Sequence, residues 1–250
     1  MQVVRIILIL SALLVIGCDS ESASDCFQRT GNIIRQQVAV ANFTKILVNP
    51  NVELILKEGE ITSVIIETGD NLLNEVSATV EDNRLILNDT NDCAFFRDFN
   101  QTKIFVTAPN ITEIRSATQF DISSDGLLSY PNLSLLSEDF NEDTGTTTGT
   151  FHLTVDSQNI AVVSNNITSF FISGRTNDLS VRFFSGIGRF EGGDLIAQNV
   201  NIYHRGTNKI IVNPVNSLRG ELRSTGDLVS LNRPPVVEIE EFFTGTLIFQ

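Results

Sequence analysis

Residues 151–181 read FHLTVDSQNIAVVSNNITSFFISGRTNDLSV, and this stretch decides the fold. Apolar pairs two positions apart recur through it: Leu153 and Val155, Ile160 and Val162, Phe170 and Ile172, and Leu179 and Val181. A period of two places alternate side chains on opposite faces of a β-strand, whereas an amphipathic helix would repeat every three to four residues. The stretch therefore predicts short strands separated by turns.

The same alternation extends over nearly the whole chain. It recurs at 52–56, 76–80, 85–87, 104–106, 200–202, 210–212, 237–239 and 247–249. Gly, Asn, Asp and Pro separate these segments, and they supply the backbone conformations that turns require. One hairpin is expected from Val76 to Leu87, with its turn at 81–84. The pattern predicts an all-β protein.

From about residue 103 onward the apolar pairs become repetitive. They recur about every 7 to 10 residues, and groups of two recur about every 17 to 21 residues. Such a repeat is typical of a parallel β-helix, in which each coil buries its apolar side chains against its neighbours. We expect this β-solenoid of short strands, with an N-terminal hairpin region. A β-sandwich gives similar turn spacing and remains the alternative.

The first residues read MQVVRIILILSALLVIGC and end at Cys18. One Arg, an apolar run and a small residue before the cut predict a signal peptide over 1–17 that is too short to span a membrane comfortably. The segment also resembles a bacterial lipobox, which implies lipidation of Cys18. Residues 18–30 then form the lipidated Cys and an acidic tether, and 31–250 form a single domain.

The chain has a net charge of −13, with no cluster of Lys and Arg. Because phosphate binding requires such clusters, we expect no nucleic-acid partner. The membrane partner is instead reached through the lipid at Cys18. The expected location is the cell envelope, on an outer-membrane lipoprotein that faces either the cell surface or the periplasm.

Apart from Cys18 the chain contains two cysteines, Cys26 and Cys93. An even pair in an exported chain favours a disulfide, because oxidising compartments preserve such bonds. We predict a Cys26 to Cys93 bridge that ties the end of the tether to the fold. Two free thiols are the alternative.

Several segments together resemble the bacterial head GIN domain, also described as a putative auto-transporter adhesin. They are 43–48, 52–59, 67–72, 80–87, 106–111, 235–237 and 245–247. The similarity spans about 40–250 and rests on strand order and spacing. The resemblance implies a parallel β-helix in a cell-envelope lipoprotein, without an established enzymatic activity.

Residues that could support metal chemistry are few. Asp139, Asn141 and Asp143 alternate as the oxygen ligands of a calcium loop do, so they form a weak candidate calcium site beside the alternative of a solvated acidic loop. His152 and His204 belong to no zinc pattern, and we expect both at turns or on the surface. We therefore assign no catalytic residue and no cofactor.

Parallel β-helices also host polysaccharide lyases and hydrolases, which is the alternative function. Charged residues that could serve such an enzyme are Arg175, Asp178, Arg182, Arg189, Glu191, Asp194 and Arg205. Lyases and hydrolases need such groups to converge on one bond. Ion pairs between neighbouring coils are the simpler interpretation, and they predict that the chain is not an enzyme.

The preferred function is a non-catalytic adhesin or binding and structural module. The chain contains 17 Phe and no Trp, and three Phe-Phe pairs stand at 95–96, 183–184 and 242–243. Strand alternation would turn one ring of each pair outward, creating a partly apolar lateral face for a protein or glycan partner. The sequence leaves the binding residues unknown.

Overall fold

The computed structural model describes residues 25–95, 97–98, 102–141, 145 and 147–250. Within these ranges the protein is all-β, as the sequence predicted. Every strand belongs to one sheet of 17 strands, and the only helices in the described ranges are two short 3-10 helices, η2 (Asp25–Phe27) and η3 (Leu73–Glu75). None of the helices in the described part has the length and apolar character to cross a membrane.

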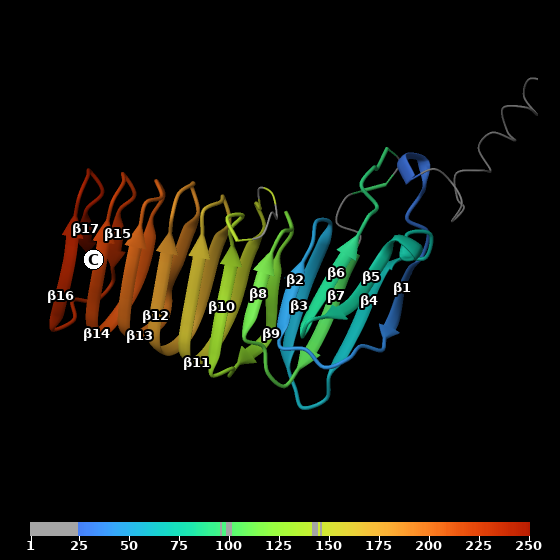
Figure 1. Cartoon of the computed structure of the whole chain (residues 1–250), viewed down its shortest axis with the longest axis horizontal. Coiled ribbons are helices and arrows are strands. Elements are labelled where there is room, and N and C mark those ends of the chain that lie inside the picture. Colours follow the sequence, from blue (N-terminus) through green and yellow to red (C-terminus); the bar gives the residue numbers. More distant parts are fainter. Residues whose placement is uncertain (1–24, 96, 99–101, 142–144, 146) are drawn as a thin grey trace, which may run out of the picture.

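The N-terminal strands form the broader end of the molecule (Figure 1). They are β1 (Ile33–Val38), β2 (Lys45–Val48), β3 (Val52–Glu58), β4 (Ser63–Gly69), β5 (Val76–Glu81), β6 (Arg84–Asp89), β7 (Thr102–Ala108), β8 (Glu113–Ser116) and β9 (Ile122–Leu128). Antiparallel pairs join β1 to β4, β4 to β7, and β5 to β6. The β5–β6 hairpin is the one predicted from the sequence, and Asp82 and Asn83 at its turn both have positive φ.

The C-terminal strands continue as a regular parallel stack toward the other end. They are β10 (Asn132–Ser137), β11 (Thr150–Ser164), β12 (Ser169–Phe183), β13 (Arg189–His204), β14 (Ile210–Leu222), β15 (Leu228–Ser230), β16 (Val236–Glu241) and β17 (Leu247–Phe249). Phe151 pairs with Phe170, and Phe170 with Phe190; Phe190 then pairs with Ile210, and Ile210 with Leu228. The chain thus returns to equivalent positions every 18 to 20 residues.

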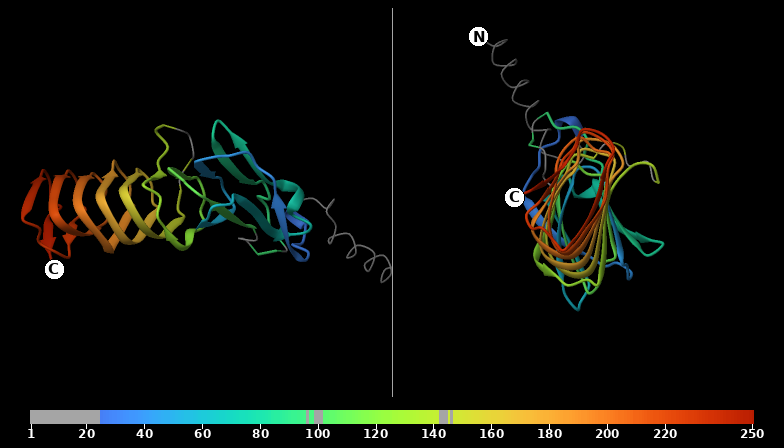
Figure 2. Two further views of the ribbon diagram at one scale, coloured as in Figure 1. Left: turned by 90° about the horizontal axis from the view of Figure 1, so that it is seen from below. Right: turned by 90° about the vertical axis from the view of Figure 1, so that its left-hand side faces the viewer.

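Seen end on, the strands outline a flattened tube with two long walls (Figure 2). Wall A consists of β6, β2, β8, β10, the second halves of β11 to β14, and β16. Wall B consists of β7, β3, β9, the first halves of β11 to β14, β15 and β17. The described strands therefore form one wrapped sheet, not the two antiparallel sheets of a β-sandwich.

Apolar side chains from both walls meet inside the tube. On wall A these include Leu133, Ile160, Leu179 and Val200, each at most 2% exposed, while their sequence neighbours face solvent. Three phenyl rings, Phe151, Phe170 and Phe183, pack in sequence along the core, with centroid distances of 4.9 and 6.0 Å. Alternation along each strand thus separates one continuous core from two outward surfaces.

The structure joins Cys26 to Cys93, as predicted, with their Cα atoms 4.5 Å apart. The bond links η2 to the segment that follows β6. The backbone N–H of Phe95 also donates to the carbonyl of Cys26 at 3.0 Å, and the Phe27 and Phe95 rings lie 5.8 Å apart. These contacts fasten the start of the described chain to the N-terminal end of the sheet.

Candidate functional site

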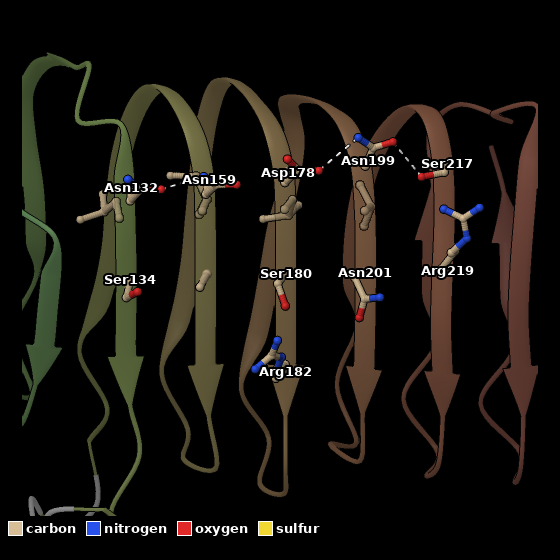
Figure 3. Close-up of a pocket in the computed structure, with 15 residues that line it drawn as sticks. Asn132, Ser134, Asn159, Asp178, Ser180, Arg182, Asn199, Asn201, Ser217 and Arg219 are labelled. Carbon is tan, nitrogen blue, oxygen red and sulfur yellow. Dashed lines mark hydrogen bonds between the residues drawn. The ribbon is translucent and has the colours of Figure 1, made fainter.

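Wall A carries an open groove of about 740 Å³ that runs across β10, β11, β12, β13 and β14 (Figure 3). Its long direction crosses the strands, so each strand contributes equivalent outward positions. The groove exists because the parallel registers align one row of polar side chains beside one row of small side chains.

The first row is here called the amide ladder, and it consists of Asn132, Asn159, Asp178, Asn199 and Ser217. Asn159 Nδ2 donates to Asn132 Oδ1 at 2.7 Å. Asn199 Nδ2 donates to Asp178 Oδ1 at 3.1 Å, and its own Oδ1 accepts from Ser217 Oγ at 2.9 Å (Figure 3). Each amide therefore keeps unused hydrogen-bonding capacity toward the groove.

The second row lies two residues further along each strand, at Ser134, Ala161, Ser180, Asn201 and Arg219. Three of its five members are small, so the groove is deepest at Ala161 and its neighbours. The hydroxyl oxygen of Ser180 is buried and has no hydrogen-bond partner among the described residues. A ligand group that reached it would supply that missing partner.

Two guanidinium groups stand at the edge of the groove opposite the amide ladder. Arg219 forms an ion pair with Glu238 of β16 at 2.9 Å. Arg182 is exposed, and it makes no hydrogen bond or ion pair within the part of the chain that the structure describes. The groove thus offers amides and hydroxyls on one side and a free cation on the other.

This arrangement suits binding better than bond cleavage. Asp178 is the only carboxylate that lines the groove. A glycosidase needs two carboxyl groups that face each other across the scissile bond. Asp178 and Arg182 are four residues apart on one strand, which separates their backbones by about 13 Å. The polar groups therefore form a row and do not converge on one point.

The sequence analysis did not identify the amide ladder, although a signal was present. Each ladder residue directly precedes one of the apolar pairs, as Asn159 precedes Ile160 and Asp178 precedes Leu179. Recurrence of Asn, Asp or Ser at that position, once per repeat, could have identified the row. What the sequence lacked was the register that aligns these positions.

The charged residues considered for an enzyme do not gather in one place. Arg182 and Asp178 line the groove on wall A, whereas Glu191 and Asp194 line a separate hollow on wall B. The two other arginines of β12 and β13 form ion pairs, Arg175 with Asp156 at 3.0 Å and Arg189 with Glu191. Arg205 is exposed just beyond β13. Ion pairing, the simpler interpretation, applies to the first two arginines.

Next to the predicted calcium residues lies a buried ion pair between Arg115 and Glu138, with an N–O distance of 2.7 Å. Burial alone would raise the pKa of Glu138. The backbone N–H and side-chain amide of Asn141, together with Arg115, outweigh burial and lower this pKa. Glu138 thereby fixes the first residues of the acidic loop.

The predicted calcium site stays untested. Asp139 Oδ1 accepts from Asn165 Nδ2 at 2.5 Å, and Asn141 Nδ2 donates to Glu138 Oε1 at 3.1 Å. Asp143 lies outside the described residues, as does Cys18. In the described ranges, no group of three His, Cys, Asp or Glu side chains could hold a metal ion.

The two histidines differ from each other. His152 is exposed on β11, where its ring stacks on Phe171 at 5.0 Å. The prediction that His204 lies at a turn or on the surface is wrong, because its side chain is fully buried at the end of β13. Its Nε2 lies 2.8 Å from the carbonyl oxygen of Asn208. Burial lowers the pKa of His204, since the charged imidazolium loses its hydration.

The phenylalanine pairs follow the prediction only in part. Phe183 is buried while Phe184 is half-buried and packs against Tyr203 at 5.2 Å, as alternation requires. Phe242 and Phe243 are both exposed, at 52% and 65%. They follow the end of β16 in a bend, where strand alternation no longer applies. Phe95 is exposed as well.

Residues 42–234 match the sequence model of the family described as "putative auto-transporter adhesin, head GIN domain". The chain belongs to this family. The match covers most of the parallel stack and all of the groove, and it confirms the resemblance carried by the strand order and spacing.

Solved structures show that the head GIN domain fold described here occurs in other bacteria. A putative adhesin from Bacteroides fragilis superposes with a TM-score of 0.78 at 20% identity, covering 89% of this chain and 99% of that one. A putative adhesin from Parabacteroides merdae gives 0.61 at 11% identity, covering 89% and 98%. A putative lipid binding protein from Parabacteroides distasonis gives 0.61 at 13% identity, with the same coverage.

At these identities the likeness concerns the fold alone. No curated protein matches the chain at a significant level. The family description and the neighbouring structures concern adhesins, which suggests a location at the cell surface or in the envelope.

Proposed function

We propose that this head GIN domain is a non-catalytic binding module of the cell envelope, built as a parallel β-helix. The observation that carries the proposal is the groove on wall A, where hydrogen-bonding side chains recur once per strand along about 740 Å³ of open surface. A row of this kind suits an extended partner that lies along the stack. The equal advance of 18 to 20 residues between paired strands supports the β-helix description.

We further propose that the module is held at the membrane by a lipid on Cys18. In this arrangement residues 1–17 are removed, residues 18–30 form an acidic tether, and 31–250 form the binding domain. Because the disulfide lies at the N-terminal end of the sheet, the tether would attach there. The groove-bearing stack would then extend away from the membrane.

The groove is tested by filling it. Ala161→Phe places a phenyl ring at its centre, whereas Ala161→Ser is the matched control that leaves it open. Cells producing each full chain are attached to wells coated with mucin, a glycoprotein. We expect Ala161→Phe to lower the number of attached cells to that of cells without the protein. Equal attachment of the two variants would remove the groove from the proposal.

Location is tested by protease treatment of intact cells. We expect the wild-type domain to be shed into the medium, and Cys18→Ser to leave no membrane-bound form. Full protection of the domain in intact cells would exclude adhesion to anything outside the cell. Recovery of membrane-bound Cys18→Ser protein would refute the lipid anchor.

A further inference from the structure

Wall B carries a second hollow of about 570 Å³, here called the slot, separate from the groove on wall A. It arises from a bulge in β13. Glu191 pairs with Phe171, but Leu195 pairs with Gly174, so three residues of β13 lie opposite two of β12. Such a bulge redirects side chains locally, and bulges are frequent beside functional sites.

One end of the slot is aromatic. The rings of His152 and Phe171 stack at 5.0 Å with an interplanar angle of 8°, and Phe171 is 42% exposed. Next along the wall, β13 presents Glu191 and then two glycines, so no further ring continues the stack. An exposed aromatic surface of this size can bind the apolar face of a flat ligand.

The other end of the slot is aliphatic and contains unfilled space. Ile211 and Leu231 form it, and Leu231 is 40% exposed. A Cβ atom added to Gly193 would lie 2.9 Å from Leu231 Cδ1, so the missing side chain leaves the space beside Leu231 open. The backbone of Gly193 does not have the positive φ that would itself require glycine. The slot is thus a gap between two apolar ends.

Polar groups line the edges of this gap. Thr154 and Ser173 share a hydrogen bond between their hydroxyl groups at 3.1 Å. Glu191 is bound to Arg189, whereas Asp194 is exposed and makes no hydrogen bond or ion pair within the described ranges. A free carboxylate accepts hydrogen bonds from hydroxyl groups, and it repels anions.

We propose that the slot binds a neutral pyranose residue of a glycan. A pyranose has an apolar C–H face, which would stack on Phe171, and an edge of hydroxyl groups, which would donate to Asp194. Uronic and sialic acids would be rejected, because they carry a negative charge and two carboxylates line the slot. The inference rests on the proposed function as a binding module, but it uses a different wall and different residues.

The test is calorimetric titration of the full chain with the neutral methyl glycosides of glucose, galactose, mannose and N-acetylglucosamine. Glucosamine and galacturonic acid methyl glycosides serve as cationic and anionic probes. We expect at least one neutral glycoside to bind with a dissociation constant of about 1 mM, and no binding of the galacturonic acid glycoside. Phe171→Ala and Asp194→Asn should each weaken that binding by about tenfold or more.

Two further variants separate a specific loss from a general one. Gly193→Leu fills the slot and should abolish binding, whereas Phe242→Ala removes an exposed ring elsewhere and should leave it unchanged. The proposal is overturned if no neutral glycoside binds, if the glucosamine glycoside binds best, or if Phe171→Ala binds like the wild type. If mucin attachment still depends on Ala161 in that case, the groove and the proposed function stand without the slot.

Discussion

Two neighbouring phenylalanines on β12 offer the sharpest test of the fold. Phe170 points into the core and is fully buried between Phe151 and Phe183. Phe171 points outward from wall B and is 42% exposed. The variants Phe170→Ala and Phe171→Ala make the same chemical change at adjacent positions, so the difference between them reports only which way each ring faces.

The structure sets the two magnitudes apart. Removing a fully buried phenyl group costs about 3 to 5 kcal/mol. The upper part of that range applies to Phe170, because its stacked rings add about 0.5 to 1.5 kcal/mol and the strands on both sides prevent collapse of the cavity. Phe171 loses only the part of its surface that is covered, which corresponds to about 1 to 2 kcal/mol. The difference of at least about 2 kcal/mol is a factor of about 30 in the unfolding equilibrium.

The assay is urea unfolding of the oxidised full chain, followed by far-ultraviolet circular dichroism because the chain contains no Trp. Comparison of midpoints requires that the slope of the unfolding free energy against urea be the same for both variants. An equal or greater loss for Phe171→Ala would mean that β12 is shifted by one residue. Such a shift would exchange the core and solvent faces of the whole strand and refute the assignment of both walls.

Three further predictions concern stability. Replacing Cys26 and Cys93 by Ser should lower the free energy of unfolding by about 4 kcal/mol in the chain-entropy model, because their sequence separation is 67 residues; matched denaturant curves of the two oxidised chains measure this. Gly174→Ala should cost at least about 2 kcal/mol, since φ is +106° and the new Cβ would lie 2.0 Å from a backbone oxygen. Gly126→Ala, with a φ of +95° but open space, should cost less, and equal thermal shifts would contradict the contact. The lowered pKa of His204 means that the unfolded chain binds more protons, so stability is complete above about pH 6.5 and falls below it by at most about 1.4 kcal/mol per pH unit; His204→Phe should remove that slope in melts at several pH values.

Local features of the fold were predictable because they depend on residues close in sequence. The alternation of Ile160 and Val162 fixes which side chains enter the core, and no distant residue is needed to infer it. The Asp82-Asn83 turn likewise follows from the tolerance of these residues for positive φ. The disulfide was predictable for a different reason, since only two cysteines remained after Cys18.

The features that escaped prediction depend on neighbours one turn away in the stack. His204 is buried in space left by glycines: a Cβ on Gly226, two turns of sequence later, would lie 2.2 Å from its Nε2. The Arg115–Glu138 pair joins β8 to the segment after β10. Because the advance per turn varies between 18 and 20 residues, sequence spacing alone does not say which residues meet.

The same geometry favours binding over catalysis on either wall. Outward side chains on one wall point in the same direction and stand about 4.8 Å apart from strand to strand, so they form rows beside a ligand instead of enclosing it. Acid and base catalysis of glycan cleavage requires two carboxyl groups on opposite sides of one bond. The bulge in β13 brings Glu191 and Asp194 near each other, yet Arg189 already pairs with Glu191. One carboxylate is left open there, which can accept a hydroxyl proton in a hydrogen bond but cannot divide the acid and base roles.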